Sequence, residues 1–405
     1  MICITKAFVD NIKVNIRNGG NSLKKRLMSI ILLLCIILSM PLGVYGAEDL
    51  KINAKSALLL DFNTGEIIYK LNENDRLAPA SITKIMTLLL AMEAVDSGKI
   101  GLKDQVVISS HAEGMGGSQV YLEAGESQEL EELFKAIAIR SANDAAVAVA
   151  EYISGSEDVF VKKMNDRAKA LGMKNTQFSN ASGLPDANHY ISAYDVALMS
   201  KELLKHDKIN EWLSIYMYDM KVGKNKPSVQ TMVNTNRLIK EYEGATGIKT
   251  GSTNEAGYCL SGSAKRGNLQ LIAVVMGSEN SKIRFDEAKR MLDYGFANYD
   301  SVSIGKKGDI IGVVPVEKGR LTEVELVLER DSYILLPKGE KGKVSKIVNL
   351  PDFVEAPLMP GNEVGTLSIY VDEKEVDKVK LVSKNSVEKA NLINILDRTI
   401  KNFLR

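Results

Sequence analysis

Cysteine and histidine are the scarcest reactive residues in this chain of 405 residues, which contains three of each. Cys3 and Cys35 lie in the first 46 residues, so only Cys259 remains beyond them and no internal disulfide is expected there. The sequence has no His-x-x-x-His or Cys-x-x-Cys pair that would suggest zinc ligands. We therefore expect neither a metal nor another cofactor, and a catalytic triad built on histidine is disfavoured.

A large excess of charge of either sign is also missing. The net charge is +1, with 25% charged and 45% hydrophobic residues, which is an ordinary composition for a globular protein. A balanced charge gives no electrostatic reason to expect a nucleic acid as partner. The length allows two or three domains and a large hydrophobic core.

The N-terminus has the pattern of an export signal. Lys24, Lys25 and Arg26 precede a long apolar run that ends in small residues before Ala47. We expect residues 1–46 to be this signal, with a start codon assigned too far upstream as the explanation for its length. An uncleaved membrane anchor is the alternative, because the apolar run approaches membrane-spanning length. Either way, the protein is expected outside the cytoplasm.

The sequence predicts that the middle of the chain has strands near its two ends and helices between them. Short apolar segments bounded by turn signals predict strands near 57–61 and 66–71, and three more after residue 244. The apolar periodicity predicts helices over the following ranges: 81–97, 129–139, 144–153, 157–171 and 192–205. The simplest packing is an α/β (α+β) domain over 47–298, with one five-stranded antiparallel sheet, an inserted helical block and helices against the sheet.

After about residue 299 the pattern changes to short strands separated by glycine and proline turns. This predicts a separate small all-β domain, a β-sandwich, over 299–382. The last segment, 383–405, has apolar residues at helical spacing and a basic end. We expect an amphipathic helix on a membrane surface, and the alternative is a helix docked on the β domain.

The apolar stretch 77–95 carries a serine and a lysine three residues apart, Ser81 and Lys84. Three other Ser-x-x-Lys sequences occur in the chain, so the spacing alone is weak evidence. Its context is different, because burial would lower the pKa of the Lys84 amine and let it act as a base toward the Ser81 hydroxyl. The simpler alternative is that Ser81 caps a helix and Lys84 extends to solvent.

Two later segments have the same ambiguity. Ser141-Ala-Asn143 joins two predicted helices, where Ser141 could be a helix cap with Asp144 completing a capping box. Lys249-Thr250-Gly251 lies on a predicted edge strand, where polar residues could simply face solvent. In a cleft, these segments could instead relay a proton and bind a substrate carboxylate, and Gly251 would let a substrate backbone approach closely.

The order of the three segments is more informative than any one of them. Ser-x-x-Lys, Ser-x-Asn and Lys-Thr-Gly occur in this order, on a helix start, a helix junction and a strand. The chain thereby resembles low-molecular-weight penicillin-binding proteins of the D-alanyl-D-alanine carboxypeptidase type. The blocks "LAPASITKIMT", "IRSANDAAVAVAE" and "GIKTGSTNEAGYCLSGSAKRG" extend the resemblance over residues 55–295. One departure is Ser252-Thr253, where that family often has an aromatic residue before the threonine.

The resemblance implies a role for each of these residues. Ser81 would be the nucleophile, Lys84 the general base and Ser141 the proton shuttle to the leaving D-alanine. Asn143 would hold the substrate amide, and Lys249 with Thr250 would bind the terminal carboxylate. The backbone N–H groups of Ser81 and Ser252, next to Gly251, would form the oxyanion hole.

The implied partners are peptidoglycan stem peptides, β-lactam antibiotics as covalent inhibitors, and the outer face of the cytoplasmic membrane through 383–405.

Three alternatives remain at this point. A β-lactamase of class A would need a deacylating glutamate in a Glu-x-x-Leu-Asn pentad, and no such pentad lies between Glu151 and Gly247. A catalytically silent binding module would not need all four of Ser81, Lys84, Ser141 and Lys249. Transpeptidase or endopeptidase activity would use the same residues, and the sequence separates it poorly from carboxypeptidase activity.

Overall fold

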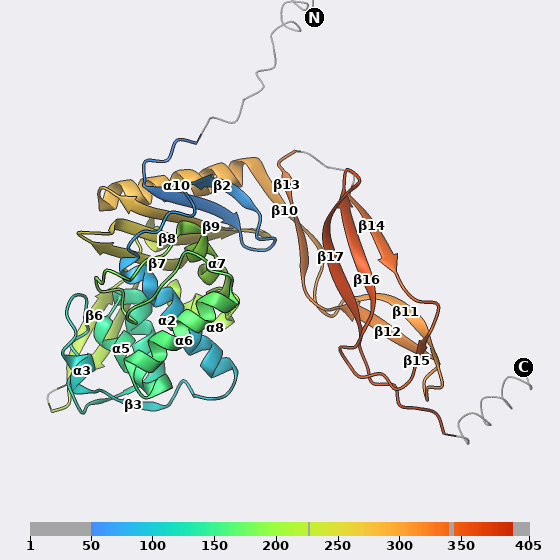
Figure 1. Cartoon of the computed structure of the whole chain (residues 1–405), viewed down its shortest axis with the longest axis horizontal. Helices are drawn as coiled ribbons and strands as arrows, with labels where there is room; N and C mark the ends of the chain where they lie inside the picture. The colour runs from blue at the N-terminus through green and yellow to red at the C-terminus, as the bar shows by residue number, and fades with distance from the viewer. Residues whose placement is uncertain (1–49, 226, 340–343, 392–405) are drawn as a thin grey trace, which may run out of the picture. The chain divides into compact units, whose positions relative to one another are not determined.

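The computed structural model describes residues 50–225, 227–339 and 344–391 (Figure 1). The predicted export signal, residues 1–46, lies outside the described residues. None of the helices in the described part of the chain is long and apolar enough to cross a membrane.

The first region is built on a five-stranded antiparallel sheet in the order β2-β1-β9-β8-β7. Its strands come from both ends of the region: β1 (Ser56–Asp61), β2 (Ile67–Leu71), β7 (Ala245–Thr253), β8 (Gly257–Arg266) and β9 (Leu269–Ser278). Every residue of β1 and nearly every residue of β9 is buried, as expected for central strands covered on both faces. The predicted sheet is confirmed, and β7 is an edge strand.

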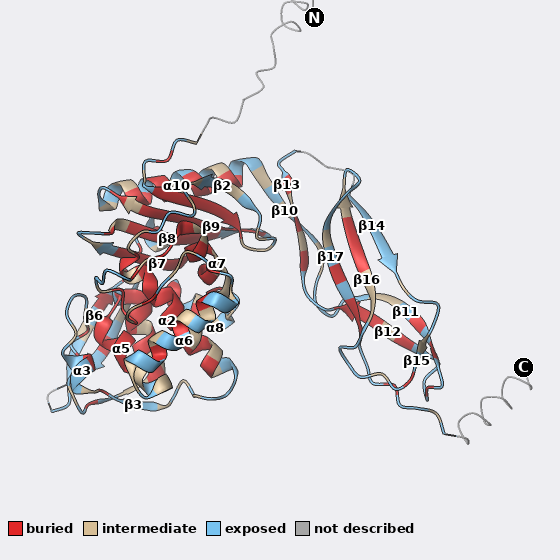
Figure 2. Cartoon of the chain, in the orientation of Figure 1, coloured by how far each residue is buried: buried red, intermediate tan, exposed pale blue. Residues whose placement is uncertain are grey.

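Helices cover both faces of this sheet (Figure 1). Helix α10 (Ser281–Asn298) packs on β8 and β9, whereas α7 (Ala193–Leu203) packs against β1 and β9 from the side of the helical block. The block contains α2 (Lys84–Asp96), α5 (Asn143–Ser154) and α6 (Glu157–Ala170). Helix α2 is buried almost all round and contacts both α5 and α7, so it forms the centre of the largest apolar cluster (Figure 2).

Short elements complete the block. They are η1 (Ala80–Thr83), β3 (Gln105–Val107), α3 (Ser110–Glu113), β4 (Ser127–Glu129), α4 (Leu130–Lys135), η2 (Ala136–Arg140), α8 (Asp207–Leu213), β5 (Met217–Val222), β6 (Ser228–Val233) and α9 (Leu238–Glu241). The sequence patterns missed α8 and the β5–β6 hairpin, because α8 is only two turns long and β5 and β6 are mostly exposed.

The second region is all-β, as predicted. Strands β10 (Tyr299–Gly305) and β13 (Ser332–Pro337) form one pair, and a six-stranded sheet has the order β14-β16-β17-β12-β11-β15. The strands of that sheet are β11 (Ile310–Glu317), β12 (Glu323–Leu328), β14 (Val344–Asn349), β15 (Val354–Glu355), β16 (Glu363–Val371) and β17 (Lys374–Ser383). An apolar cluster of its own, centred on Leu326, Ile369 and Leu381, fills this region.

The helix expected over 383–405 does not begin where the sequence pattern placed it. Ser383 ends β17, and Val387 and Lys389 make antiparallel bridges to Leu358 and Gly319. These backbone pairings tie the segment to the β region and compete with helix formation there. The remainder of the expected helix, 392–405, lies outside the described residues.

Candidate active site

Ser81 and Lys84 lie at the junction between a 3₁₀ turn and a buried helix. Ser81 belongs to η1, and Lys84 is the first residue of α2, so the helix starts three residues later than predicted. Ala80 has a left-handed backbone (φ 49°), a conformation that L-residues seldom adopt. The Nζ atom of Lys84 lies 3.0 Å from Ser81 Oγ. The predicted pair is therefore in direct hydrogen-bond contact, and neither the helix-cap nor the solvent-exposed alternative holds.

The surroundings of Lys84 favour a neutral amine. Its side chain is fully buried and also donates to Asn143 Oδ1 and to the Ser182 carbonyl, each at 2.5 Å. Burial lowers the pKa of Lys84 well below its usual value, and the positive charge of Lys249 lowers it further, whereas Asp144 acts in the opposite direction. An amine with a lowered pKa next to a hydroxyl can accept its proton at neutral pH.

The Ser141–Asn143 segment is shaped by an unusual helix end. The π-helical turn η2 ends at Arg140, and Ser141 follows in the left-handed conformation (φ 66°, ψ 32°). Within the part of the chain that the structure describes, the nearly buried Ser141 hydroxyl makes no hydrogen bond. Strained, unpaired groups of this kind cluster at functional sites. A hydroxyl without a partner is available to a substrate.

The capping box considered for this segment is wrong. Ala142, not Ser141, precedes α5 as its N-cap, and it offers no side-chain hydrogen bond. The Asp144 carboxylate instead accepts hydrogen bonds from the backbone N–H groups of Val120 and Leu122, each at 3.1 Å. Burial raises the pKa of Asp144, and these N–H groups oppose that rise. The side chain thus fastens a distant loop to the site, and it also accepts from the Ala145 N–H of its own helix at 2.9 Å.

Asn143 connects that loop to Lys84. Its Nδ2 donates to the Gly116 carbonyl at 2.6 Å, while its Oδ1 accepts from Lys84. The backbone N–H of Asn143 donates to the Ser118 carbonyl at 2.7 Å. The amide is consequently fixed in one orientation, which a group that recognises a substrate amide requires.

Strand β7 carries the third predicted segment. Lys249 is buried on this edge strand, and its Nζ donates to the Thr250 carbonyl at 3.1 Å. Burial, followed by the charge of Arg284, lowers the pKa of Lys249 to about 7. Thr250 Oγ1 donates to Thr235 Oγ1 at 2.8 Å, and Ser252 at the end of the segment is exposed. The alternative that the Lys249 and Thr250 side chains simply face solvent is wrong, since both residues are buried.

Gly251 brings β7 against the serine turn. A Cβ atom at this position would lie 2.9 Å from the backbone N of Ser81 and 3.0 Å from the backbone N of Ile82. Such distances are shorter than atomic contacts allow, so only glycine permits this approach. The three predicted segments therefore meet, and the N–H groups of η1 lie beside β7.

Sequence reasoning missed two contributors to the site. Arg284 on α10 is buried and donates to the carbonyls of Gly251 (3.0 Å) and Cys259 (3.2 Å), which fixes the end of β7. The Ser182 carbonyl contacts Lys84 from a loop. A buried arginine in a helix that packs on the sheet gives little sequence signal, and a backbone carbonyl gives none.

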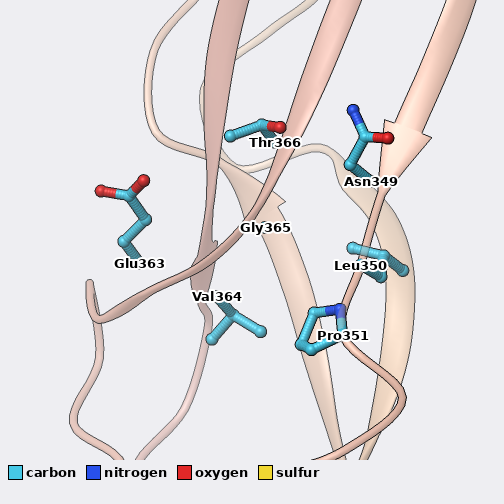
Figure 3. Close-up of a pocket in the computed structure, with 7 residues that line it drawn as sticks. All are labelled: Asn349, Leu350, Pro351, Glu363, Val364, Gly365 and Thr366. Atoms are coloured by element: carbon cyan, nitrogen blue, oxygen red, sulfur yellow. The ribbon is translucent and has the colours of Figure 1, made fainter.

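The described structure has hollows in both regions. A small pocket beside η1 is lined by Pro79, Ala80, Leu184, His189 and Thr253, among others, and it borders the Ser81 turn. A second, open pocket in the β region is lined by Asn349, Leu350, Pro351, Glu363, Val364, Gly365 and Thr366 (Figure 3). This pocket contains no candidate nucleophile next to a base, and Glu363 is paired with Lys380. Among the described residues, no group of histidine, cysteine and carboxylate side chains could hold a metal ion.

Comparison with known proteins gives matches along most of the chain. Residues 44–280 match the D-alanyl-D-alanine carboxypeptidase family, and residues 299–389 match the C-terminal domain of penicillin-binding protein 5. The chain is 44% identical over 388 residues to the D-alanyl-D-alanine carboxypeptidase DacF of Bacillus subtilis, covering 94% of this chain and 99% of DacF. It is 34% identical over 360 residues to DacA of Escherichia coli, covering 87% and 88% of the two chains.

Solved structures give the same result. Penicillin-binding protein 5 from Haemophilus influenzae superposes with a TM-score of 0.69 at 33% identity, covering 84% of this chain and 98% of that one. An ampicillin-bound penicillin-binding protein D2 from Listeria monocytogenes has a TM-score of 0.54 at 30% identity, covering 62% and 100%. The chain belongs to the D-alanyl-D-alanine carboxypeptidase family, whose members are penicillin-binding serine hydrolases that act on peptidoglycan.

Proposed function

We propose that Ser81 is the acylated serine of this carboxypeptidase and that Lys84 is its general base. The observation that carries the proposal is the 3.0 Å contact between Ser81 Oγ and the Nζ of a fully buried lysine whose pKa is lowered. Oγ would attack the carbonyl carbon of the penultimate D-alanine of a stem peptide while its proton passes to Lys84.

The other residues support the same reaction. Breaking the peptide bond requires a proton on the leaving amine, and the Ser141 hydroxyl would relay it from Lys84. Asn143 would hold the substrate amide, and Lys249 with Thr250 would bind the terminal carboxylate. The backbone N–H groups of Ser81 and Ser252 would stabilise the oxyanion, with Gly251 allowing the approach. Water would then hydrolyse the ester and release the shortened stem peptide. β-Lactams would acylate Ser81 in the same way.

The test is Ser81→Ala in two assays, D-alanine release from a pentapeptide stem and the mass of the protein after incubation with penicillin. The wild type should release D-alanine and gain one penicillin, and the variant should do neither. Equal D-alanine release by both proteins would refute the proposal. Penicillin labelling of the wild type without D-alanine release would instead favour a silent binding module.

We further propose that the protein is exported through residues 1–46 and works at the outer face of the cytoplasmic membrane. Within it, 47–298 would be the peptidase domain and 299–382 a β-sandwich. The support for attachment is the sequence of 392–405, in which Leu392, Leu396, Ile400 and Phe403 recur at helical spacing.

Deletion of 392–405 keeps the bridges made by Val387 and Lys389 and should move the exported protein from the membrane fraction to the soluble fraction. Unchanged membrane recovery would exclude this anchor.

A further inference from the structure

The turn at 180–184 supplies one of the three polar contacts of Lys84. Its Ser182 carbonyl accepts from Lys84 Nζ at 2.5 Å, and Asn143 Oδ1 accepts from the same atom at the same distance. A neutral amine has two N–H donors and one lone pair, whereas an ammonium has three donors and no lone pair. If the two carbonyl oxygens hold the two N–H groups, the lone pair is left facing Ser81 Oγ. The position of the Ser182 carbonyl therefore decides where the base points.

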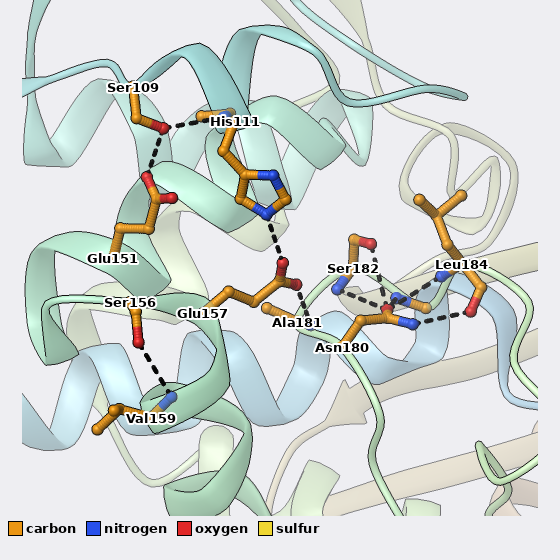
Figure 4. Close-up of polar contacts among 12 residues, drawn as sticks. Ser109, His111, Glu151, Ser156, Glu157, Val159, Asn180, Ala181, Ser182 and Leu184 are labelled. Carbon is orange, nitrogen blue, oxygen red and sulfur yellow. Dashed lines mark hydrogen bonds and ion pairs between the residues drawn. The ribbon is translucent and has the colours of Figure 1, made fainter.

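Asn180 organises this turn through its side chain (Figure 4). Its Oδ1 accepts from the backbone N–H groups of Ser182 (3.2 Å), Gly183 (2.6 Å) and Leu184 (3.1 Å), and from Ser182 Oγ (3.2 Å). Its Nδ2 donates to the Leu184 carbonyl at 2.9 Å. One half-buried side chain thus closes the turn from inside, and no catalytic atom touches it.

The rest of the turn is held from outside. The N–H of Ala181 donates to Glu157 Oε1 at 2.9 Å (Figure 4). The Ala181 carbonyl accepts from Thr87 Oγ1 of α2 at 2.6 Å. Gly183 lies so close to the serine turn that a Cβ atom there would be 1.9 Å from the Ala80 carbonyl oxygen. A turn packed this tightly between α2 and η1 transmits a small displacement directly to Lys84.

We propose that Asn180 is a positioning residue for the base: it fixes the Ser182 carbonyl and, through it, the direction of the Lys84 amine. The inference rests on the proposed roles of Ser81 and Lys84. Lysine has a flexible stem, so two fixed acceptors are needed to hold its Nζ in one place. A displacement of about 1 Å at a reacting group can cost about 10²-fold in rate.

The test compares Asn180→Ala with Asn165→Ala. Asn165 is a matched control, because this half-buried side chain also holds a neighbouring backbone: its Oδ1 accepts from Phe178 N–H and its Nδ2 donates to the Phe178 carbonyl, each at 2.9 Å. The measurement is the second-order rate constant of acylation by a fluorescent penicillin as a function of pH, together with the melting temperature of each variant.

For Asn180→Ala we expect a plateau about 10²-fold below that of the wild type. Its acid limb should move to lower pH, because a carbonyl acceptor stabilises an ammonium more than an amine and its loss lowers the pKa of Lys84. Asn165→Ala should lose melting temperature while keeping the wild-type plateau and acid limb. An Asn180→Ala profile that matches that of Asn165→Ala at every pH overturns the inference.

Asn180→Asp is a second variant that keeps the shape and the acceptor oxygen. It places a carboxylate in the turn and removes the bond from Nδ2 to Leu184, so the acid limb should move to higher pH, opposite to Asn180→Ala. An acid limb in the wild-type position overturns the inference for this variant too. A wild type that is not acylated at Ser81 would instead overturn the proposed function itself.

Discussion

The two folded regions differ sharply in what they bury. The sheet-and-helix region buries the charged or titratable side chains of the following residues: Asp61, Lys84, Glu126, Asp144, His189, Asp195, Lys249, Arg284 and Glu287. In the described part of the β region, Ser332, Ser368 and Ser383 are the only buried polar residues. Burying a charge costs several kcal/mol, so each of these side chains needs partners that compensate for the loss of water. The region that contains the proposed site thus buries charged side chains, and the described part of the β region does not.

The largest expected effect comes from replacing a buried charged residue of the sheet-and-helix region with an apolar one, as found in the β region. Lys84→Met removes the amine and keeps an unbranched apolar chain, so acylation by penicillin should fall by about 10²- to 10⁴-fold. The free energy of unfolding should change by no more than about 2 kcal/mol. The variant no longer has to bury an amine, which stabilises it, but it also loses the hydrogen bonds of that amine, which destabilises it. Stopped-flow acylation and urea unfolding measure the two. The exposed Lys374→Met is the control. A loss of stability much larger than this would mean that Lys84 serves the fold.

A second prediction uses the lowered pKa of Lys249, which is about 7. If its ammonium binds the substrate carboxylate, the second-order acylation rate constant should fall as the pH rises through about 7, because the free enzyme loses that charge. Lys249→Arg keeps a positive charge at all these pH values. Its alkaline limb should move up by more than about one pH unit, with a plateau lowered about tenfold by the different shape. An alkaline limb at the wild-type pH would mean that a group other than Lys249 causes it.

The third prediction disrupts the apolar core of the β region without touching the chemistry. Ile369→Ala in β16 removes a fully buried side chain and should cost about 2–5 kcal/mol of unfolding free energy. Acylation of the protein that remains folded should match the wild type. Calorimetry and penicillin labelling on the same sample check both, with the exposed Val376→Ala as the matched control. Reduced acylation at full folding would show that the β region contributes to the reaction.

The smallest expected effect concerns His189, which pairs with Thr83 Oγ1 at 2.8 Å. Burial lowers its pKa from 6.5 to about 4. The unfolded chain therefore binds a proton at this residue between these pH values and the folded one does not, so stability is lost as the pH falls from 6.5 toward 4. His189→Gln removes this loss of stability. The difference in melting temperature between the variant and the wild type should therefore change between pH 6.5 and about 4.

His111→Gln is the contrasting control. The hydrogen bond to Glu157 raises the pKa of His111, so its contribution to stability is present below pH 6.5 and is lost as the pH rises through the folded value. The two variants should therefore depend on pH with opposite signs. Parallel curves would contradict the assignment for His189.

The sequence alone was sufficient for the sheet and for the three chemical segments. Short, nearly continuous apolar runs mark β1 and β9, which is the pattern of strands buried on both faces. Helix η1–α2 was predicted as one helix from residue 81, and the 3₁₀ turn that presents Ser81 escaped because Gly183 and Gly251 pack against it from distant parts of the chain. The β5–β6 hairpin was missed since exposed strands lack the apolar pattern.

What the sequence by itself determined is the identity and order of Ser81, Lys84, Ser141, Asn143 and Lys249, because reactive side chains in a fixed order need no coordinates to be recognised. What only the tertiary structure decided is their state. The hold of Arg284 on β7 and the contact of the Ser182 carbonyl with Lys84 both join segments far apart in the chain. The pKa of Lys84 depends on burial and on Lys249, which lies 165 residues away in sequence but close in space. The apolar sequence around Lys84 predicted its burial, but only long-range packing brings the charge of Lys249 close enough to lower the pKa of Lys84 further.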